Sequence, residues 1–466
     1  MGSSGDTTVP SGRDVAARIR SSLGDAPALV IAWSAREPHR VGECALLEGA
    51  GPWWIGRDGA GSKATSFGRY RPGSTLMTGR LVGESVSRGQ LELTRTSEGV
   101  VVKNVGPHAR LAINGVELAG ALLEEGDVVE IVGHYVFRFG TRPRSMGEAV
   151  DWPAFAFGEA DAFGIVGESP AAWKLRADIA FAARTHLHVL LRGGSGTGKE
   201  LAAAAIHALS RRARGPFVAR SAATFPPGLV DAELFGNARN YPNAGMPERE
   251  GLVGAADGGT LFLDEIGETP LDAQAHLLRV LDGGEYHRLG DTRARRADFR
   301  LVCATNRDVA ELKVDLAARL KLVIEIPALD ARRDDIPLIA RHLVAGATET
   351  SPAASKFVTR GARVELAIDP ALVVTLLGAS YPTNVRQLEA ILWRAMRDSP
   401  EPPLTLAHAE AVAALDDEED DHEYSEVELR TTLDRHAWNV SSASRALGIT
   451  RHSLGRLMKK HALKKP

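Results

Sequence analysis

The feature that most constrains this chain is a glycine-rich loop between an apolar strand and a helix, in VLLRGGSGTGKE at residues 189–200. The apolar residues before the loop predict a buried strand, and the residues after it have the composition of a helix. Gly193, Gly196 and Gly198 allow backbone N–H groups to turn toward a phosphate. Lys199 adds a positive charge beside the helix N-terminus, which carries a partial positive charge of its own. Together these residues predict a phosphate-binding loop.

The composition is that of an ordinary globular chain. A length of 466 residues predicts about three domains, and a net charge of -3 indicates no particular partner. Cys44 and Cys303 lie in different predicted domains, which excludes a disulfide framework and fits a reducing compartment. No apolar segment suits a signal peptide or a membrane span. We therefore expect a cytoplasmic protein without a membrane partner.

The first third of the chain has the pattern of a small β domain. Residues 1–27 are rich in Gly, Ser and Pro and predict a flexible lead-in. In residues 28–140, short β-rich runs such as LVIAW, LELT, VVEIV and YVFRFG alternate with clusters of Gly, Asn and Asp. This alternation predicts a β-sandwich.

Several residues of this domain resemble those of a forkhead-associated (FHA) domain, a β-sandwich that binds phosphothreonine. The matches are Gly56-Arg57 after a strand, Ser87-Arg88 before a strand, an Asn-Gly hairpin turn at 114–115, and EEGDVVEIVGHYVFRF at the end. The resemblance implies that Arg57, Ser87 and Arg88 bind a phosphothreonine protein through charge-assisted hydrogen bonds to its phosphate.

Two positions depart from the FHA pattern. Gln90 stands where a histidine usually follows the Ser-Arg pair, and Ala109 aligns with the asparagine that contacts the peptide backbone. These departures leave an alternative open, in which the sandwich no longer binds phosphopeptides and only docks or oligomerises.

The central part of the chain predicts a parallel α/β domain. Residues 141–162 contain prolines and little apolar periodicity, and they predict a tether. In residues 163–343, the apolar strands HVLLRG, FVARS, GTLFLDE, FRLVCA and LVIEIP alternate with helix-forming segments, as in a sheet covered on both faces. Asp264 and Glu265 end the third strand, where Asp264 can join a magnesium shell and Glu265 can orient an attacking water.

The order of these motifs resembles the AAA+ domain of sigma-54-dependent transcription activators. The matching segments are IVGES, GGSGTGKE, AELFG, DGGTLFLDEIGE, QAHLLRVLDGGEYHRLG, VCATNRD, ARRDDIPLIARHL and NVRQLEA. The family also places a glutamate directly after the loop lysine, as at Glu200, where other phosphate-binding loops carry the Ser or Thr that holds magnesium. The resemblance implies ATP and Mg²⁺ as cofactors and assembly into a homo-oligomeric, hexameric ring.

The resemblance also implies roles for individual residues. Asp264 and Glu265 match the Walker B pair, with Asp264 in the second coordination shell of the magnesium. Arg319 matches the arginine finger, which reaches the site of a neighbouring subunit in a ring. Arg386 matches the sensor arginine of the helical lid, and a Thr-Asn pair at the end of the fourth strand senses the γ-phosphate. The implied nucleotide-binding residues are Gly193, Gly194, Ser195, Gly196, Thr197, Gly198, Lys199, Glu200, Thr305, Asn306 and Arg386.

Three parts of the core depart from the activator pattern. Lys313 replaces a second arginine finger and loses its bidentate geometry. Ser221 replaces the asparagine that restrains the Walker B glutamate. Residues 240–245, NYPNAG, replace the GAFTGA hexapeptide that contacts sigma-54, with Pro242 where the family has an aromatic side chain and Tyr241 one position early.

The last part of the chain predicts only helices. Residues 344–414 have amphipathic spacing and fit the helical lid of an AAA+ module, and residues 415–423 predict an acidic linker. Residues 424–466 predict a helix-turn-helix, and NVSSASRALGITRHSLGRLMKKHAL resembles the Fis-like tail of the same activators. The candidate DNA-binding residues are Arg445, Arg451, His452, Ser453, Arg456, Lys459 and Lys460.

Two functional hypotheses follow from the sequence. In the first, the chain is an ATP-hydrolysing transcriptional regulator that binds upstream DNA, acts on the sigma-54 RNA polymerase holoenzyme and senses a phosphothreonine protein. In the second, the chain is a DNA-binding scaffold whose nucleotide site gates oligomerisation without contact to sigma-54, because NYPNAG replaces GAFTGA.

Overall fold

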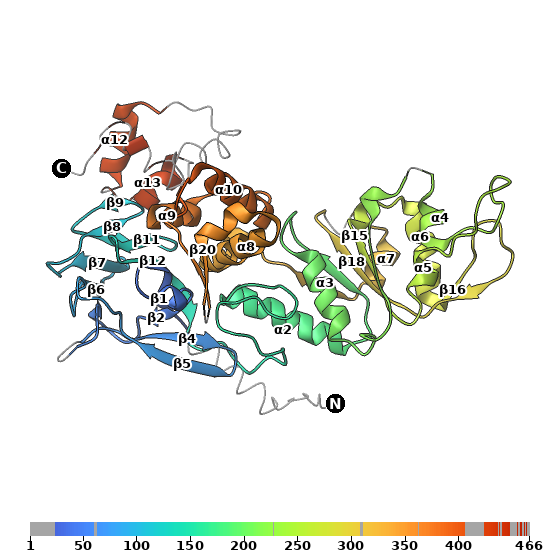
Figure 1. Cartoon of the computed structure of the whole chain (residues 1–466), viewed down its shortest axis with the longest axis horizontal. Coiled ribbons are helices and arrows are strands. Elements are labelled where there is room, and N and C mark those ends of the chain that lie inside the picture. The colour runs from blue at the N-terminus through green and yellow to red at the C-terminus, as the bar shows by residue number, and fades with distance from the viewer. Residues whose placement is uncertain are drawn as a thin grey trace, which may run out of the picture.

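The computed structural model describes residues 24–59, 63–226, 228–307, 311–361, 363–405, 424–436, 438, 440–447, 454, 457–458, 461 and 463. The molecule is elongated (Figure 1). The N-terminal strands lie toward one end, the α/β sheet lies at the other end, and the helices of residues 336–398 lie between them.

Two antiparallel sheets form the N-terminal domain, as the short β-rich runs predicted. The eight-stranded sheet has the order β5-β4-β2-β1-β12-β11-β8-β9, and the four-stranded sheet has the order β10-β7-β6-β3. Leu29, Ile31 and Phe137 belong to the buried cluster of this domain. The sandwich extends slightly beyond 28–140 at both ends, because β1 and β12 already pair at Asp25 and Pro143. The strands are β1 Asp25–Ser34, β2 Cys44–Leu46, β3 Trp53–Ile55, β4 Phe67–Arg71, β5 Ser74–Gly79, β6 Leu91–Arg95, β7 Val100–Asn104, β8 Leu111–Ile113, β9 Val116–Glu117, β10 Gly120–Leu123, β11 Val128–Ile131 and β12 Tyr135–Pro143.

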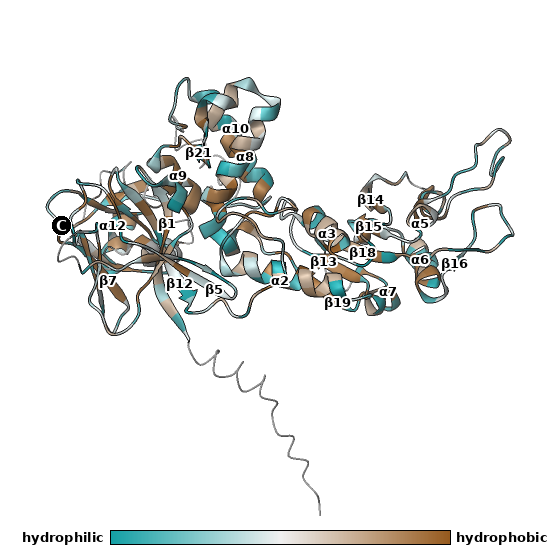
Figure 2. Ribbon diagram, turned by 60° about the horizontal axis from the view of Figure 1, so that its bottom comes forward, coloured by the Kyte–Doolittle hydropathy of each residue, from teal (hydrophilic) through white to brown (hydrophobic). Residues whose placement is uncertain are grey.

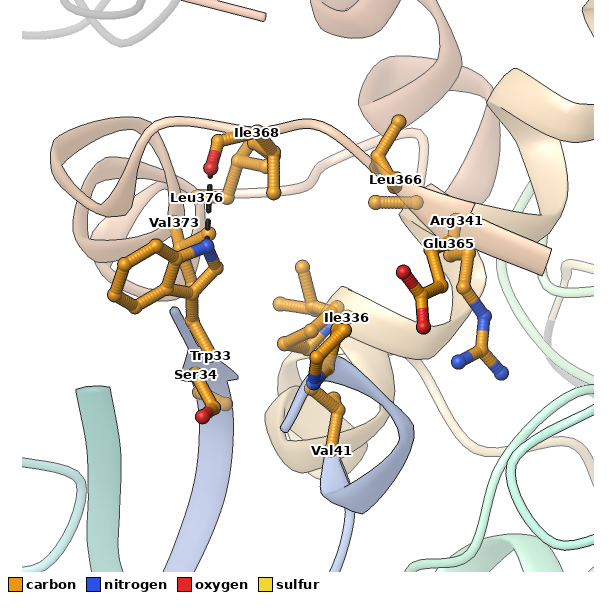
Figure 3. A pocket seen from close by; sticks show the side chains of 14 residues that line it. Trp33, Ser34, Val41, Ile336, Arg341, Glu365, Leu366, Ile368, Val373 and Leu376 are labelled. Carbon is orange, nitrogen blue, oxygen red and sulfur yellow. Dashed lines mark hydrogen bonds between the residues drawn. The ribbon is translucent and has the colours of Figure 1, made fainter. Parts of the chain in front are cut away.

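The sandwich packs directly on the helical lid. Ala32, Val128 and Val136 share one buried cluster with lid residues, which explains why β1 is apolar on both faces. The indole N–H of Trp33 donates to the Ile368 carbonyl (3.0 Å), beside a small cavity of about 50 Å³ between the two domains (Figure 3). The two domains are therefore one packed unit.

Five parallel strands form the central sheet, and they are the five that the sequence predicted. Their order is β14-β15-β18-β13-β19. Neighbouring residues of a strand, such as Leu261 and Phe262, belong to different buried clusters, so both faces of the sheet are covered. The elements of this domain are α2 Pro170–Arg184, β13 Val189–Arg192, α3 Lys199–Ala208, β14 Phe217–Ser221, α4 Val230–Phe235, α5 Leu252–Ala255, β15 Thr260–Asp264, α6 Leu271–Gly283, β16 Glu285–Tyr286, β17 Arg295–Arg296, β18 Arg300–Thr305, α7 Val314–Arg319 and β19 Leu322–Glu325.

The segment 141–162 is not the tether that the sequence predicted. Asp161 is buried and forms an ion pair with the fully buried Arg176 of α2 (Oδ2 to Nε, 2.9 Å). Phe155 stacks on a tryptophan of the same helix, and Arg71 of β4 donates to the Phe155 carbonyl (2.9 Å). The prediction was wrong because the partners of this segment lie on elements that no sequence spacing connects to it.

The helical lid begins earlier than the predicted residue 344. Its buried cluster includes Leu329, Ile336 and Ile339, and α8 runs unbroken across the expected boundary. The boundary was misplaced because the motif ARRDDIPLIARHL continues from the core into the lid without a turn signal. The lid elements are η5 Leu329–Asp335, α8 Ile336–Thr350, η6 Pro352–Phe357, β20 Val358–Arg360, β21 Val364–Leu366, α9 Pro370–Gly378 and α10 Val385–Asp398.

Two adjacent carboxylates of η5 join the sandwich to the core. Asp334 forms ion pairs with Arg138 (3.0 Å) and Arg142 (2.8 Å) of β12. Asp335 is buried and accepts hydrogen bonds from the two backbone N–H groups that precede α2 (2.8 and 2.9 Å). Neighbouring residues of one short segment therefore hold two different domains.

The C-terminal segment contains helices α12 Glu426–Arg435 and α13 Val440–Leu447. Leu429, Leu433 and Leu454 are buried in one small cluster. Arg445 lies on α13, and its side chain is not among the parts that the structure describes. Six candidate DNA-binding residues lie outside the described residues: Arg451, His452, Ser453, Arg456, Lys459 and Lys460. Within the described part of the chain, no helix has the length and apolar character needed to span a membrane.

Candidate functional site

The glycine-rich loop connects β13 to the N-terminus of α3. Gly196 (φ +72°) and Gly198 (φ +98°) adopt left-handed backbone conformations that L side chains rarely take. The Thr197 hydroxyl closes the loop by donating to the Gly194 carbonyl (2.9 Å). Glu200 is exposed in the first turn of α3. The loop therefore has the backbone shape and the helix dipole that favour a bound anion.

Lys199 is buried within this loop. Its Nζ donates to the carbonyls of Gly193 and Gly194, both at 3.0 Å. Burial lowers the pKa of Lys199, although the nearby carboxylates Asp264 and Glu265 act in the opposite direction. Neutral carbonyls therefore hold the ammonium. A phosphate oxygen can replace them, because it accepts a stronger, charge-assisted hydrogen bond.

Asp264 and Glu265 lie near the loop because parallel strands end at the same edge of the sheet. β15 pairs with β18, and β18 pairs with β13, where Thr305 lies opposite Arg192. Asp264 Oδ1 accepts a hydrogen bond from the Glu265 N–H (3.0 Å). Glu265 has a left-handed backbone (φ +53°, ψ +45°), an uncommon conformation that often marks functional residues.

Ser221, at the end of β14, contacts the second of these carboxylates. Its hydroxyl donates to Glu265 Oε2 at 3.4 Å, which is long for a hydrogen bond between oxygens. The sequence predicted such a weak contact from the shortness of serine, and the geometry agrees.

We expect Ser221→Asn to lower the basal rate of ATP hydrolysis about fivefold, because a longer amide side chain would restrain Glu265 with a shorter hydrogen bond. The kcat of the purified chain without any partner protein measures this. Ser221→Ala, which removes the contact, should be at least as fast as the unchanged chain. An unchanged rate in Ser221→Asn would contradict a restraining role.

Three other predicted nucleotide-binding residues lie on α10 and at the end of β18, the strand that pairs with β13. Arg386 of α10 donates from Nη1 to Ser195 Oγ (2.7 Å), so the lid contacts the loop directly. Thr305 is 1% exposed, and its hydroxyl accepts a hydrogen bond from the Arg307 N–H (3.0 Å), which gives it a structural role in its own turn. Asn306 follows β18 and is exposed.

Arg319 is not brought to the loop of its own chain. It ends α7 and forms a bidentate pair with Asp282 of α6 (Nε to Oδ1 2.5 Å, Nη2 to Oδ2 3.2 Å). Both side chains are exposed, at 46% and 45%. Lys313 precedes α7, and its backbone N–H donates to Gln274 (2.9 Å).

The NYPNAG segment lies in a loop, residues 237–250, that projects from the core beside the β16–β17 hairpin (Figures 1 and 2). Asn237 is 2% exposed, and its amide donates to three carbonyls of the loop, including those of Tyr241 (3.3 Å) and Pro247 (3.0 Å). The Tyr241 ring packs on Gly290 of the hairpin, where a Cβ would lie 2.4 Å from it. The aromatic ring is therefore seated against the neighbouring hairpin.

Two of the three predicted phosphothreonine-binding residues, Arg57 and Arg88, place their side chains beside Gly59 of the sandwich. At Gly59, a Cβ would lie 3.4 Å from Arg88 Nε and 3.5 Å from Arg57 Nη1. The Ser87 hydroxyl oxygen is buried and has no hydrogen-bond partner among the described residues. Two neighbouring guanidinium groups favour a bound anion, and a buried hydroxyl without a partner is a donor that such an anion could use.

Gln90, which departs from the FHA pattern, is fully buried and organises the same turn. Its Oε1 accepts a hydrogen bond from the Ser87 N–H (3.0 Å). Its Nε2 donates to Asn104 Oδ1 (2.8 Å) and to the carbonyl of Ala109 (2.9 Å). The glutamine therefore fixes the backbone that carries Ser87.

Asn384 is a site residue that the sequence analysis missed. It lies directly before α10, and its side chain contacts the Ser195 carbonyl of the loop (2.9 Å). The signal was the first letter of the motif NVRQLEA, but no spacing connects it to a loop 189 positions earlier.

Two family profiles match the chain. The Sigma-54 interaction domain matches residues 165–329, and the Fis family of bacterial regulatory proteins matches residues 426–461. The transcriptional regulatory protein ZraR of Escherichia coli K12 is 37% identical over 310 residues, covering 63% of this chain and 68% of ZraR. The transcriptional regulatory protein GlrR of the same strain is 35% identical over 360 residues, covering 72% of this chain and 78% of GlrR. The chain belongs to the sigma-54-dependent transcriptional regulators.

This regulator therefore carries the P-loop AAA+ ATPase domain of its family and a Fis-type helix-turn-helix. The N-terminal sandwich lies outside both matched ranges. The crystal structure of NtrX from Brucella abortus in complex with ADP is 32% identical in sequence, covers 65% of this chain and 70% of that chain, and has a TM-score of 0.48.

Proposed function

We propose that this regulator hydrolyses ATP in a ring of identical subunits and uses the hydrolysis to remodel a transcription complex near upstream DNA. The observation that carries this proposal is the gathering of Lys199, the Asp264–Glu265 pair and Arg386 around one loop. In this arrangement Lys199 binds the β- and γ-phosphates and Glu265 orients the attacking water. Arg386 adds positive charge where the transition state becomes more negative.

Asp264 fits a place in the second shell of a nucleotide-bound Mg²⁺. In the described ranges, no three or more His, Cys, Asp or Glu side chains gather closely enough to hold a metal by themselves. A single carboxylate at a strand tip suits an ion that takes most of its ligands from phosphates and water, as Mg²⁺ usually does. The ion would neutralise part of the phosphate charge.

Arg319 completes the site of the neighbouring subunit in this proposal. To reach that site it must leave Asp282, and exposed ion pairs of this kind contribute little to stability. Ring assembly can therefore exchange one partner of Arg319 for a phosphate of the adjacent subunit, which couples hydrolysis to assembly.

We propose the sigma-54 RNA polymerase holoenzyme as the partner, on the basis of family membership. One observation favours a second function, a DNA-bound scaffold whose nucleotide site gates oligomerisation. The NYPNAG segment matches GAFTGA at no position, and Tyr241 is seated on Gly290.

A trapping experiment decides between these two functions. The purified chain is incubated with ADP–aluminium fluoride and sigma-54, complexes are separated by size, and ATPase rate is measured against protein concentration. A trapped complex supports the activator. Cooperative ATPase activity without a complex supports the scaffold, and the absence of ATPase activity at every concentration contradicts the proposed hydrolysis. Lys199→Ala, which cannot hold the phosphates, is the control that should not trap.

We further propose that the sandwich binds a phosphothreonine protein through Arg57, Ser87 and Arg88. Two observations support this role: the Arg57 and Arg88 side chains both lie beside Gly59, and the buried Ser87 hydroxyl has no hydrogen-bond partner among the described residues. The test is calorimetric titration of the full chain with a phosphothreonine peptide library and its unphosphorylated counterpart. Binding that requires the phosphate and is lost in Arg57→Ala is expected, and equal binding of both libraries would contradict the proposal.

A further inference from the structure

Three successive residues of the lid contact the nucleotide loop, and only the third of them, Arg386, has a part in the mechanism proposed above. The Val385 N–H donates to the Gly196 carbonyl (3.2 Å), and Arg386 donates to Ser195 Oγ (2.7 Å). Asn384, which precedes them, is 4% exposed. A buried amide at such a contact needs hydrogen-bond partners, and the identity of those partners indicates its role.

The side chain of Asn384 bonds to two segments that are distant in the sequence. Its Nδ2 donates to the Ser195 carbonyl (2.9 Å), and its Oδ1 accepts a hydrogen bond from the Leu329 N–H (2.7 Å). Leu329 begins η5, the segment that leads from the core sheet into the lid. One amide therefore joins the nucleotide loop, the core-to-lid connection and the start of α10.

These bonds are unusual for an asparagine at the start of a helix. Such a residue normally accepts a hydrogen bond from a backbone N–H of the helix that follows, but Asn384 makes no such bond. Its backbone (φ +54°, ψ −128°) lies in a turn conformation in which Gly, Asn and Asp predominate and glycine is the least strained. Glycine would adopt this backbone conformation with less strain. The asparagine side chain instead supplies the two hydrogen bonds, which glycine cannot make.

We propose that Asn384 is a positioning residue that holds Arg386 against the nucleotide loop. The approach is close, because a Cβ on Gly196 would lie 2.3 Å from the Thr383 carbonyl oxygen. Arg386 has a long side chain with several rotatable bonds, so its position over the loop depends on where its backbone is fixed. The amide of Asn384 fixes that backbone. This inference deepens the ATPase function proposed above and rests on it.

The test compares Asn384→Gly with the unchanged full-length chain, using the slowly hydrolysed analogue ATPγS for binding and ATP for turnover. Asn384→Gly suits the backbone but removes both hydrogen bonds. We expect the dissociation constant of ATPγS to rise about tenfold and kcat for ATP to fall. Tm should stay close to that of the unchanged chain or fall slightly, because relief of the positive-φ backbone offsets only part of the two lost hydrogen bonds. If Asn384 only shaped the turn, glycine would match or exceed the unchanged chain in binding and turnover, and that result would overturn the proposal.

Two further variants show through which atoms Asn384 acts. Asn384→Asp keeps the acceptor for Leu329 and loses the donor to Ser195, so it should also weaken ATPγS binding. In an Arg386→Ala background, Asn384→Gly should cause little additional loss, because both changes remove the same contact. If the losses of ATPγS affinity in the two single variants simply add in the double variant, Asn384 does not act through Arg386, and the proposal is overturned.

The binding readout separates this inference from the proposed function. If the unchanged chain binds ATPγS but does not hydrolyse ATP, the proposed function fails, and the affinities of the variants still decide the role of Asn384. If the unchanged chain hydrolyses ATP and Asn384→Gly is equal to it in both readouts, only the inference fails. Failure of the unchanged chain to bind ATPγS would overturn both.

Asn114→Gly is the matched control for the change from asparagine to glycine. Asn114 also has a positive φ (+51°) and also uses its amide, which accepts a hydrogen bond from the Val128 N–H (2.9 Å). It lies in the sandwich, away from the nucleotide loop. Its replacement should leave the affinity for ATPγS unchanged.

Discussion

Replacing Lys199 with alanine is expected to lower ATP turnover at least about 100-fold, because the positive charge that meets the developing phosphate charge is removed. The fold should persist, since the ammonium is buried at some cost and its partners are two neutral loop carbonyls. The measurement is the steady-state ATPase rate of the full chain over a range of protein concentrations, together with circular dichroism of the same samples.

The control for this change is Lys174→Ala. Lys174 is an exposed lysine of α2 that pairs with Asp178 on the surface, so its loss should leave the rate unchanged. Turnover in Lys199→Ala equal to that of the unchanged chain would contradict the assignment of the glycine-rich loop as the hydrolytic site.

Replacing Arg176 with methionine is expected to destabilise the ATPase domain by about 3–5 kcal/mol, because it leaves a buried carboxylate without its counter-charge. Arg176 is fully buried, pairs with Asp161, and donates to the carbonyls of Gly167 (2.8 Å) and Ile165 (2.9 Å). The measurement is the shift of the urea unfolding midpoint, followed by circular dichroism.

Arg184→Met on the same helix is the matched control. Arg184 forms an exposed pair with Asp151 and should shift the midpoint little when replaced. Asp161→Leu combined with Arg176→Met should recover part of the stability, since neither charge is then left alone. An Arg176→Met midpoint no lower than that of the Arg184→Met control would show that the buried pair does not hold the segment in place.

The sequence predicted the parts of this fold that depend on local patterns. The five central strands were predicted correctly because each is a short apolar run. The phosphate-binding loop was recognisable because its glycines and Lys199 are contiguous. The resemblance also predicted Arg57, Ser87 and Arg88 as phosphothreonine-binding residues, and that role stays a prediction; the structure places the side chains of Arg57 and Arg88 beside Gly59.

The features that the sequence could not provide depend on contacts between distant segments. Asp161 looked like part of a polar tether because its counter-charge, Arg176, gave no sign of being buried. In the sequence, Gln90 appeared only as a departure from the FHA pattern. Its hydrogen bond with the Ser87 N–H is visible only in the structure. Asn384 was missed because its partners, Ser195 and Leu329, are far away along the chain.

Asp334 and Asp335 have a consequence for how ligand binding in one domain can affect ligand binding in another. Asp334 pairs with the sandwich, and Asp335 accepts hydrogen bonds from the core. A ligand that shifts either domain would therefore move the same pair of adjacent residues. Coupling between two binding equilibria is reciprocal. If an anion on the sandwich changes nucleotide affinity by some factor, nucleotide must change the affinity for that anion by the same factor. A partner bound to the sandwich would then have a different affinity for the ATP-bound regulator than for the ADP-bound one, and the sandwich would report the nucleotide state to that partner.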